Sequence, residues 1–166
     1  MIVASFFGDE ARIVLRRAAT AEETMNEKQV RITSFRDFNV YQTTYAVCIQ
    51  VMTEPLPKLP DSERYDLKDQ LSRSVKAVPR LIAEGYAKRH QRAGFQKYLD
   101  DAMAECNETI VGLEMCRDIY GTHVQNFPLS EVIDAYDKAG RQLYKLAAAW
   151  SKFKDERRSA QPKRAS

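Results

Sequence analysis

The stretch at residues 67–85, LKDQLSRSVKAVPRLIAEG, decides the fold of this chain. Its apolar residues recur at steps of three and four, a spacing that places them on one face of an α-helix. Its basic residues lie mostly off that face. The stretch therefore predicts a long helix with a core-facing apolar stripe and a positively charged outer surface. The apolar positions are Leu67, Leu71, Val75, Val78 and Ile82, and the basic positions are Lys68, Arg73, Lys76 and Arg80.

The segments before and around this stretch indicate where the first two helices begin and end. Residues 34–53 predict a helix with Ser34 as its N-cap and Asp37 in the position of a capping box. The proline-rich run EPLPKLPDS ends that helix and predicts a semi-rigid extended connection. The central helix is then expected over residues 62–88, capped by Asp61 or Ser62 and kinked at an interior proline, Pro79.

Two further helices are predicted over residues 93–120 and 129–153, because their apolar residues form heptad seams. Four long helices with short connections predict an all-α fold, an antiparallel up-and-down four-helix bundle at residues 34–153. The first seam is Phe95, Leu99, Ala102, Cys106, Thr109, Leu113 and Cys116; the second is Leu129, Val132, Tyr136, Ala139, Leu143, Leu146, Trp150 and Phe153.

The two ends of the chain lie outside this pattern. Residues 1–33 are expected to be an N-terminal extension that is partly disordered, and Met25 leaves open whether the residues before it are native. Residues 154–166 are charged and lack apolar periodicity, so they predict a disordered tail.

Length and composition indicate one soluble domain. A chain of 166 residues is long enough to bury a core without a disulfide or a metal. The start lacks the basic region of a signal peptide, and no run approaches the roughly 18 apolar residues of a membrane span. The three cysteines, Cys48, Cys106 and Cys116, form no CxxC pair, so we interpret them as reduced core thiols of a cytoplasmic protein.

Several local runs form recognisable motifs. They are Phe35-Arg36-Asp37-Phe38 with Val40-Tyr41, Asp69-Gln70-Leu71 with Arg73, Ser74 and Val75, Ile82-Ala83-Glu84-Gly85-Tyr86, and Tyr98-Leu99 followed by Asp101-Ala102 and residues 104–109. Over roughly residues 35–153 the chain resembles the bacterial four helix bundle protein family. That family includes proteins encoded in intervening sequences of large-subunit ribosomal RNA genes and the accessory variability determinant of diversity-generating retroelements.

The resemblance implies a homo-oligomer, typically a pentamer, with no catalytic activity. For the retroelement branch it also implies a basic surface that binds nucleic acid, RNA or DNA, and a reverse transcriptase as partner. The chain departs from the family pattern at Ser72, where an arginine is usual, and at Leu81, where an asparagine is common.

The basic residues of the central helix and of the connection after it are the candidate nucleic-acid site. One interpretation is a stripe that contacts phosphates; the other is a solvated face, or pairing with the acids of residues 93–120. No aromatic-interleaved stacking platform is evident, so binding is expected to be dominated by the backbone and sensitive to salt. The candidate residues are Arg73, Lys76, Arg80, Lys88, Arg89 and Arg92.

Two other chemistries have weaker support. Asp101, Glu105 and Glu108 share a helix face, but the Glu-x-x-His motif of a di-metal bundle is absent, so no metal or cofactor is expected. Arg117 and His123 have a spacing like that of helical ribonucleases of the HEPN class, with His123 expected in a loop. An exposed loop histidine is the simpler interpretation.

Glu84 and Gly85 are assigned to an interface. An acid beside the apolar end of the central helix indicates a buried or interface hydrogen bond, and Gly85 permits close approach of a neighbouring segment or begins the helix stop. The sequence thus predicts a non-enzymatic, homo-oligomeric bundle that acts as a nucleic-acid-associated accessory or adaptor protein. The alternatives are a protein-binding scaffold without nucleic acid and the helical ribonuclease. No small-molecule substrate and no membrane partner are expected.

Overall fold

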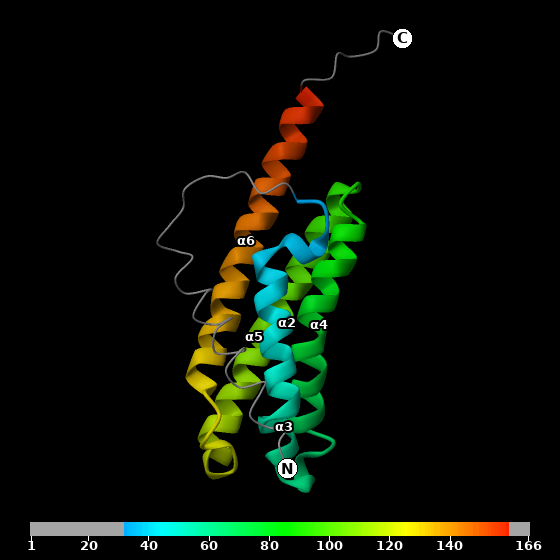
Figure 1. The fold of residues 1–166 in the computed structure, drawn as a ribbon. Helices are drawn as coiled ribbons and strands as arrows, with labels where there is room; N and C mark the ends of the chain where they lie inside the picture. Colours follow the sequence, from blue (N-terminus) through cyan, green and yellow to red (C-terminus); the bar gives the residue numbers. More distant parts are fainter. Residues whose placement is uncertain (1–31, 160–166) are drawn as a thin grey trace.

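The computed structural model describes residues 32–159 and shows an all-α, antiparallel up-and-down four-helix bundle, which confirms the predicted fold class (Figure 1). The long helices are α2 (Asn39–Thr53), α4 (Leu67–Ala87), α5 (Arg92–Val124) and α6 (Leu129–Ser159). Each packs against two others, in the cyclic order α2, α4, α5, α6. Among the described residues, no helix combines the length and the apolar character that crossing a membrane requires.

The bundle begins with the predicted capping box. Ser34 and Asp37 cap a short 3-10 helix, η1 (Phe35–Asp37), and α2 starts separately at Asn39 because the backbone is extended at Phe38. The Asp37 carboxylate accepts hydrogen bonds from the backbone N–H groups of Thr33 and Ser34, each at 2.8 Å. These backbone bonds, followed by one from the Thr33 hydroxyl, lower the pKa of Asp37.

The proline-rich connection is not extended as predicted. It contains a helical turn, α3 (Pro55–Lys58), and a 3-10 turn, η2 (Asp61–Glu63). A proline at the first helical position is compatible with a helix, since that N–H has no partner inside the helix. Leu56 and Leu59 are buried, so the connection closes one end of the core. The expected cap at Asp61 or Ser62 is also wrong: α4 begins at Leu67, with Asp66 as its N-cap.

The third and fourth helices are longer than predicted. The backbone of α5 leaves helical geometry at Tyr120 (φ −117°, ψ 25°), where the helix was expected to end, and one more turn follows to Val124. Helix α6 reaches Ser159, so residues 154–159, predicted as part of a disordered tail, are helical. Lysine, glutamate and arginine are strong helix formers, which explains the extension without an apolar seam. The expectations for residues 1–31 and 160–166 lie outside the described residues.

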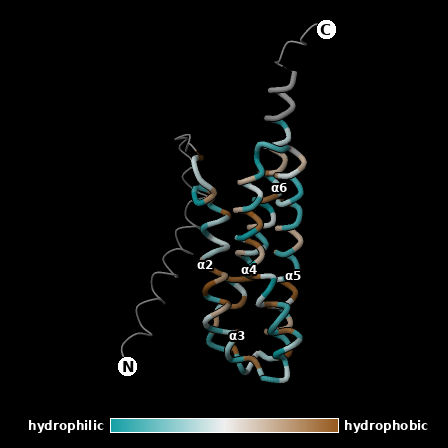
Figure 2. Tube along the Cα trace, turned by 90° about the vertical axis from the view of Figure 1, so that its right-hand side faces the viewer, coloured by the Kyte–Doolittle hydropathy of each residue, from teal (hydrophilic) through white to brown (hydrophobic). Residues whose placement is uncertain are grey.

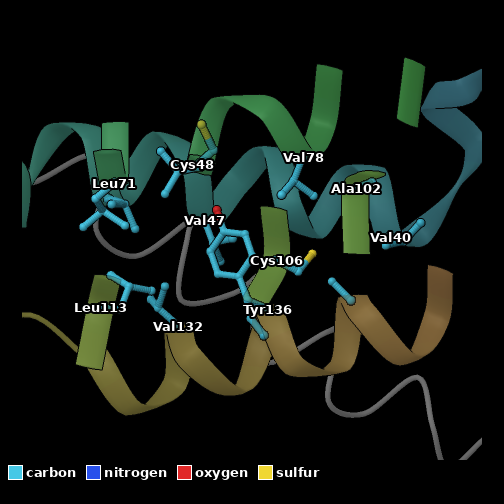
Figure 3. Packing of buried hydrophobic residues seen from close by; sticks show 14 of the residues in the cluster. Val40, Val47, Cys48, Leu71, Val78, Ala102, Cys106, Leu113, Val132 and Tyr136 are labelled. Carbon is cyan, nitrogen blue, oxygen red and sulfur yellow. The ribbon is translucent and has the colours of Figure 1, made fainter. Parts of the chain in front are cut away.

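The core lies between the four helices. Hydrophobic and hydrophilic positions alternate along each helix (Figure 2), and the apolar stripe of α4 is buried together with the seams of α5 and α6. The three cysteines are buried and free, as predicted. Tyr136 projects from α6 into the centre of the cluster, towards Val47 and Cys106 (Figure 3). Its side chain is fully buried.

Candidate nucleic-acid interface

Three cations share the outer face of α4. Arg73, Lys76 and Arg80 stand at steps of three and four on this helix, and all three are exposed. The opposite face carries Leu71, Val78 and the other apolar residues that anchor α4 in the core. Core packing therefore fixes the rotation of the helix and turns these three side chains to solvent. We call Arg73, Lys76 and Arg80 the α4 cation row.

The row forms ion pairs within its own helix rather than with α5. Arg73 lies 3.0 Å from Asp69 and Arg80 lies 3.9 Å from Glu84, both at i,i+4 spacing. Their side chains remain 70% and 68% exposed. Exposed pairs of this kind contribute only about 0–1 kcal/mol each, so a phosphate can compete for both arginines. Among the described residues, Lys76 has no acid within ion-pair distance.

The two edges of the row face different helices. The charge of Arg80 acts on Glu105 of α5. Burial is the largest effect that raises the pKa of Glu105, and the charge of Glu108 raises it further. The charge of Arg80 partly opposes this shift. Lys76 lies towards α2. Burial raises the pKa of the Cys48 thiol, and the charge of Lys76 partly opposes this effect.

The remaining basic residues do not simply continue the row. Lys88 and Arg89 follow the end of α4, and Arg92 is the first residue of α5. Arg89 turns back onto the helix: its guanidinium carbon lies 4.0 Å from the centre of the Tyr86 ring, and its Nη1 donates a hydrogen bond of 2.9 Å to the Tyr86 carbonyl. The structure therefore brings Arg89 to an aromatic surface that the sequence argument missed.

Four aromatic rings lie in a continuous series along the α2 and α4 side of the bundle. Tyr86 on α4 meets Phe35 of η1 edge-on with ring centres 6.4 Å apart, Phe35 meets Tyr41 of α2 at 4.8 Å, and Tyr41 stacks on Tyr45 at 5.8 Å. We call Tyr86, Phe35, Tyr41 and Tyr45 the aromatic row. The sequence showed no aromatic-interleaved platform, and the members of this row come from three separate segments that only the fold brings together. The i,i+4 spacing of Tyr41 and Tyr45 was the one signal in the sequence.

Glu84 and Gly85 have different surroundings. The Glu84 carboxylate is 48% exposed and pairs with Arg80, so it is not buried within this chain, and the alternative of an interface hydrogen bond stays a prediction. Gly85 is buried against Phe95 and Tyr98 of α5, and this close approach accounts for the glycine. Gly85 thus offers little surface to a second subunit.

The acids of α5 do not converge on one centre. Asp101 pairs with Lys97, and Glu105 lies in the field of Glu108 and Arg80. Among the side chains that the structure describes, no three of His, Cys, Asp or Glu gather as a metal site requires.

Arg117 and His123 have separate surroundings. Arg117 pairs with Asp118 at 2.7 Å and lines a hollow of about 320 Å³ at the turn between α5 and α6. His123 is in the last turn of α5 rather than in a loop, packs edge-on against Tyr120, and does not line that hollow. Nothing in this arrangement favours the ribonuclease interpretation.

A second surface on α5 is apolar. Val111, Met115 and Ile119 stand four residues apart, with 48%, 46% and 64% of each exposed. We call them the α5 apolar stripe. Val111 and Met115 also line a groove of about 290 Å³ with Leu67 and Leu71 of α4. Exposed apolar groups that line up in this way mark interaction surfaces more often than single exposed residues do.

The fold defines this chain as an all-α helical-bundle protein. The family described as 23S rRNA-intervening sequence protein matches residues 36–145, which is most of the chain. The chain belongs to this family, and the resemblance inferred from its sequence is confirmed. Membership suggests an RNA-associated role. No curated protein and no solved structure matches the chain.

Proposed function

We propose that this protein is a non-enzymatic accessory or adaptor protein that associates with RNA through the α4 cation row and works as a homo-oligomer. The observation that carries the proposal is the exposure of Arg73 and Arg80, whose acidic partners belong to the same helix. Lys76 adds an exposed charge between them. Membership in the intervening-sequence protein family supports RNA as the polyanion.

Such a surface binds phosphates without reading bases. Lysine and arginine that contact phosphates release counterions, so the affinity falls steeply as salt rises. A helix face that presents three cations but is not inserted in a groove gives position rather than sequence specificity. The proposal therefore predicts RNA binding that tolerates many sequences and weakens strongly with salt.

The test replaces the row and compares it with a matched set. Arg73→Gln, Lys76→Gln and Arg80→Gln together remove three charges from α4. Lys138, Arg141 and Lys145 have the same i, i+3, i+7 spacing and are all exposed on α6, so their triple glutamine variant is the control. RNA affinity is measured by fluorescence anisotropy at several salt concentrations. We expect the α4 variant to lower the slope of log affinity against log salt by about 2, at roughly 0.7 per phosphate contact on a single strand.

Two results contradict the proposed surface. One is a wild-type affinity that hardly changes with salt. The other is an equal loss in the α4 and α6 variants, which would mean that overall charge rather than the α4 face matters. If the wild-type protein binds no RNA, the protein-binding scaffold becomes the better interpretation.

The homo-oligomer has a separate basis, the α5 apolar stripe. Three large side chains about half exposed lie beside a groove between α4 and α5, a surface that a second copy of the chain would cover. A pentamer, as the family resemblance implies, has five times the 19.1 kDa mass of the chain. The reverse transcriptase partner of the retroelement branch stays a prediction.

Light scattering coupled to size exclusion tests this assembly. Met115→Lys places a charge in the middle of the stripe and is expected to yield the 19.1 kDa species. Tyr65→Lys is the matched control, because Tyr65 is 85% exposed and does not line the groove. A wild-type protein that runs as a monomer, or a Met115→Lys protein of unchanged mass, would rule out the stripe as the interface.

A further inference from the structure

The aromatic row carries its own cations. The guanidinium carbon of Arg36 lies 4.5 Å from the centre of the Phe35 ring, and that of Arg89 lies 4.0 Å from the centre of the Tyr86 ring. Both arginines are exposed. Two rings of the aromatic row, Phe35 and Tyr86, therefore each carry an arginine guanidinium plane.

Tyr45 is the member of the row with the most open surface. Its ring stacks nearly parallel on Tyr41, with an angle of 18° between the planes, and 52% of the residue is exposed. Tyr41 packs against the core, so it holds one side of the Tyr45 ring in place. A single exposed aromatic residue is ordinary, but a ring fixed by stacking presents a flat and pre-ordered face.

A cation lies on the same side of the bundle. The charge of Lys76 of the α4 cation row acts on the Cys48 thiol of α2, and Cys48 is three residues from Tyr45 on the same helix. Flat rings, guanidinium planes and a lysine within one surface are the groups that bind unpaired nucleotides: bases stack on the rings and the arginine planes, and the cations contact phosphates. A double helix cannot use such rings, because its bases already stack on one another.

We propose that the aromatic row, with Arg36, Arg89 and Lys76, is a binding platform for single-stranded RNA, on which an unpaired base stacks against Tyr45. This proposal rests on the RNA association proposed above and adds the strand type to it. The exposed arginines Arg36 and Arg89, which lie over the rings of Phe35 and Tyr86, favour a nucleic acid over a second copy of the chain. The acids nearby already have partners: Asp37 accepts hydrogen bonds from Thr33 and Ser34, and Glu84 pairs with Arg80.

The experiment uses the full chain and compares an unstructured single-stranded RNA of about 16 nucleotides, within the site sizes of known platforms, with a duplex of the same sequence. Tyr45→Ala is expected to weaken single-strand binding on the order of tenfold, as loss of one stacked base does. Duplex affinity and the salt slope stay unchanged. Tyr45→Phe keeps the ring and the wild-type affinity. Tyr144→Ala, at an exposed tyrosine of α6 outside the row, also keeps it.

Three outcomes overturn the platform. In the first, Tyr45→Ala binds the single strand as tightly as the wild type does. In the second, Tyr45→Ala loses affinity for the single strand and for the duplex equally. In the third, Tyr45→Ala changes the mass of the RNA-free protein, which would assign this face to a second copy of the chain. In all three outcomes the wild-type protein still binds RNA in a salt-dependent way. If the RNA association itself were wrong, the wild-type protein would bind neither the single strand nor the duplex, so the two failures can be distinguished.

Discussion

Gly85 of α4 lies directly against Tyr98 of α5: a Cβ built on Gly85 would be 3.0 Å from the Cβ of Tyr98 and 3.4 Å from the ring of Phe95. The distance of 3.0 Å is tighter than nine in ten contacts of real Cβ atoms, so Tyr98 would have to shift to admit a side chain at position 85. The two helices approach this closely because position 85 has no side chain. The glycine in the run Ile82-Ala83-Glu84-Gly85-Tyr86, one of those on which the family resemblance was based, is therefore explained by packing between α4 and α5.

Gly85→Ala is accordingly expected to destabilise the bundle. Overpacking costs about 1–3 kcal/mol, and the better helix propensity of alanine returns about 1 kcal/mol, so we expect a net loss of about 1 kcal/mol in the free energy of unfolding. Gly140→Ala is the control, because nothing lies within 4 Å of a Cβ built there. That change is expected to stabilise α6 by about 1 kcal/mol. Urea denaturation measures both; a Gly85→Ala protein as stable as Gly140→Ala would contradict the packing argument.

The cysteines are expected to be inert in the folded protein. Burial raises the pKa of Cys106 to about 12 and that of Cys116 to about 11, and the thiolate is the reactive form. A thiol reagent should therefore label the native protein slowly and the unfolded protein fast. Fast labelling of native protein would contradict the burial of these groups.

The same pKa shifts predict the alkaline stability. The unfolded thiol loses its proton near about pH 8.5, whereas the folded Cys106 thiol keeps it until about 12. The folded state thus binds more protons across this window, and stability falls as pH rises through it. Cys106→Ala should flatten this decline. An identical slope in both proteins would mean that the thiol is not shielded.

The helices were predictable because their signal is local. A seam such as Leu99, Cys106 and Leu113 depends only on steps of three and four, and the outward position of Arg73 and Arg80 follows from the same period. The proline connection was not predictable, because the burial of Leu56 and Leu59 depends on residues distant in the sequence. Leu56 lies in the helical turn α3, and Leu59 follows that turn with an extended backbone. The expectation of an extended chain came from the prolines alone.

Which charged groups pair with one another, and which aromatic rings meet, could not be predicted from the sequence for the same reason. Whether the acids of α5 reach Arg73 depends on the rotation of α5, which its whole apolar seam determines. Phe35 and Tyr86 meet only because η1 folds over the end of α4. Such contacts between separate segments require the fold, so the α4 cation row was predicted and the aromatic row was not.

Glu105→Gln is expected to stabilise the protein at neutral pH. Burial and the charge of Glu108 raise the pKa of Glu105, so the folded state holds this proton more strongly than the unfolded state does. Stability is therefore greatest below the unfolded pKa of about 4.3 and declines until the pH passes the folded pKa. Glutamine removes that decline. Melting temperatures should be equal for both proteins in acid and higher for Glu105→Gln at neutral pH, and a lower value there would contradict the argument.

Tyr136 supplies the last prediction. Its hydroxyl is buried in the centre of the core without a hydrogen-bond partner among the described residues, and burial raises its pKa well above the ordinary value. A polar group in this position opposes folding, because the unfolded chain bonds it to water. Tyr136→Phe keeps the ring that packs between the helices and removes only the oxygen. We expect the free energy of unfolding to rise by about 1 kcal/mol.

Tyr120→Phe is the comparison, since the Tyr120 hydroxyl donates a hydrogen bond to Glu63 of η2 and so joins the end of α5 to the connection before α4. The same chemical change there should lower the melting temperature. Thermal unfolding followed by circular dichroism measures both variants under one set of conditions. If Tyr136→Phe proved less stable than the wild type, the hydroxyl would have to be bonded in the folded protein, and the apolar description of the core centre would be wrong.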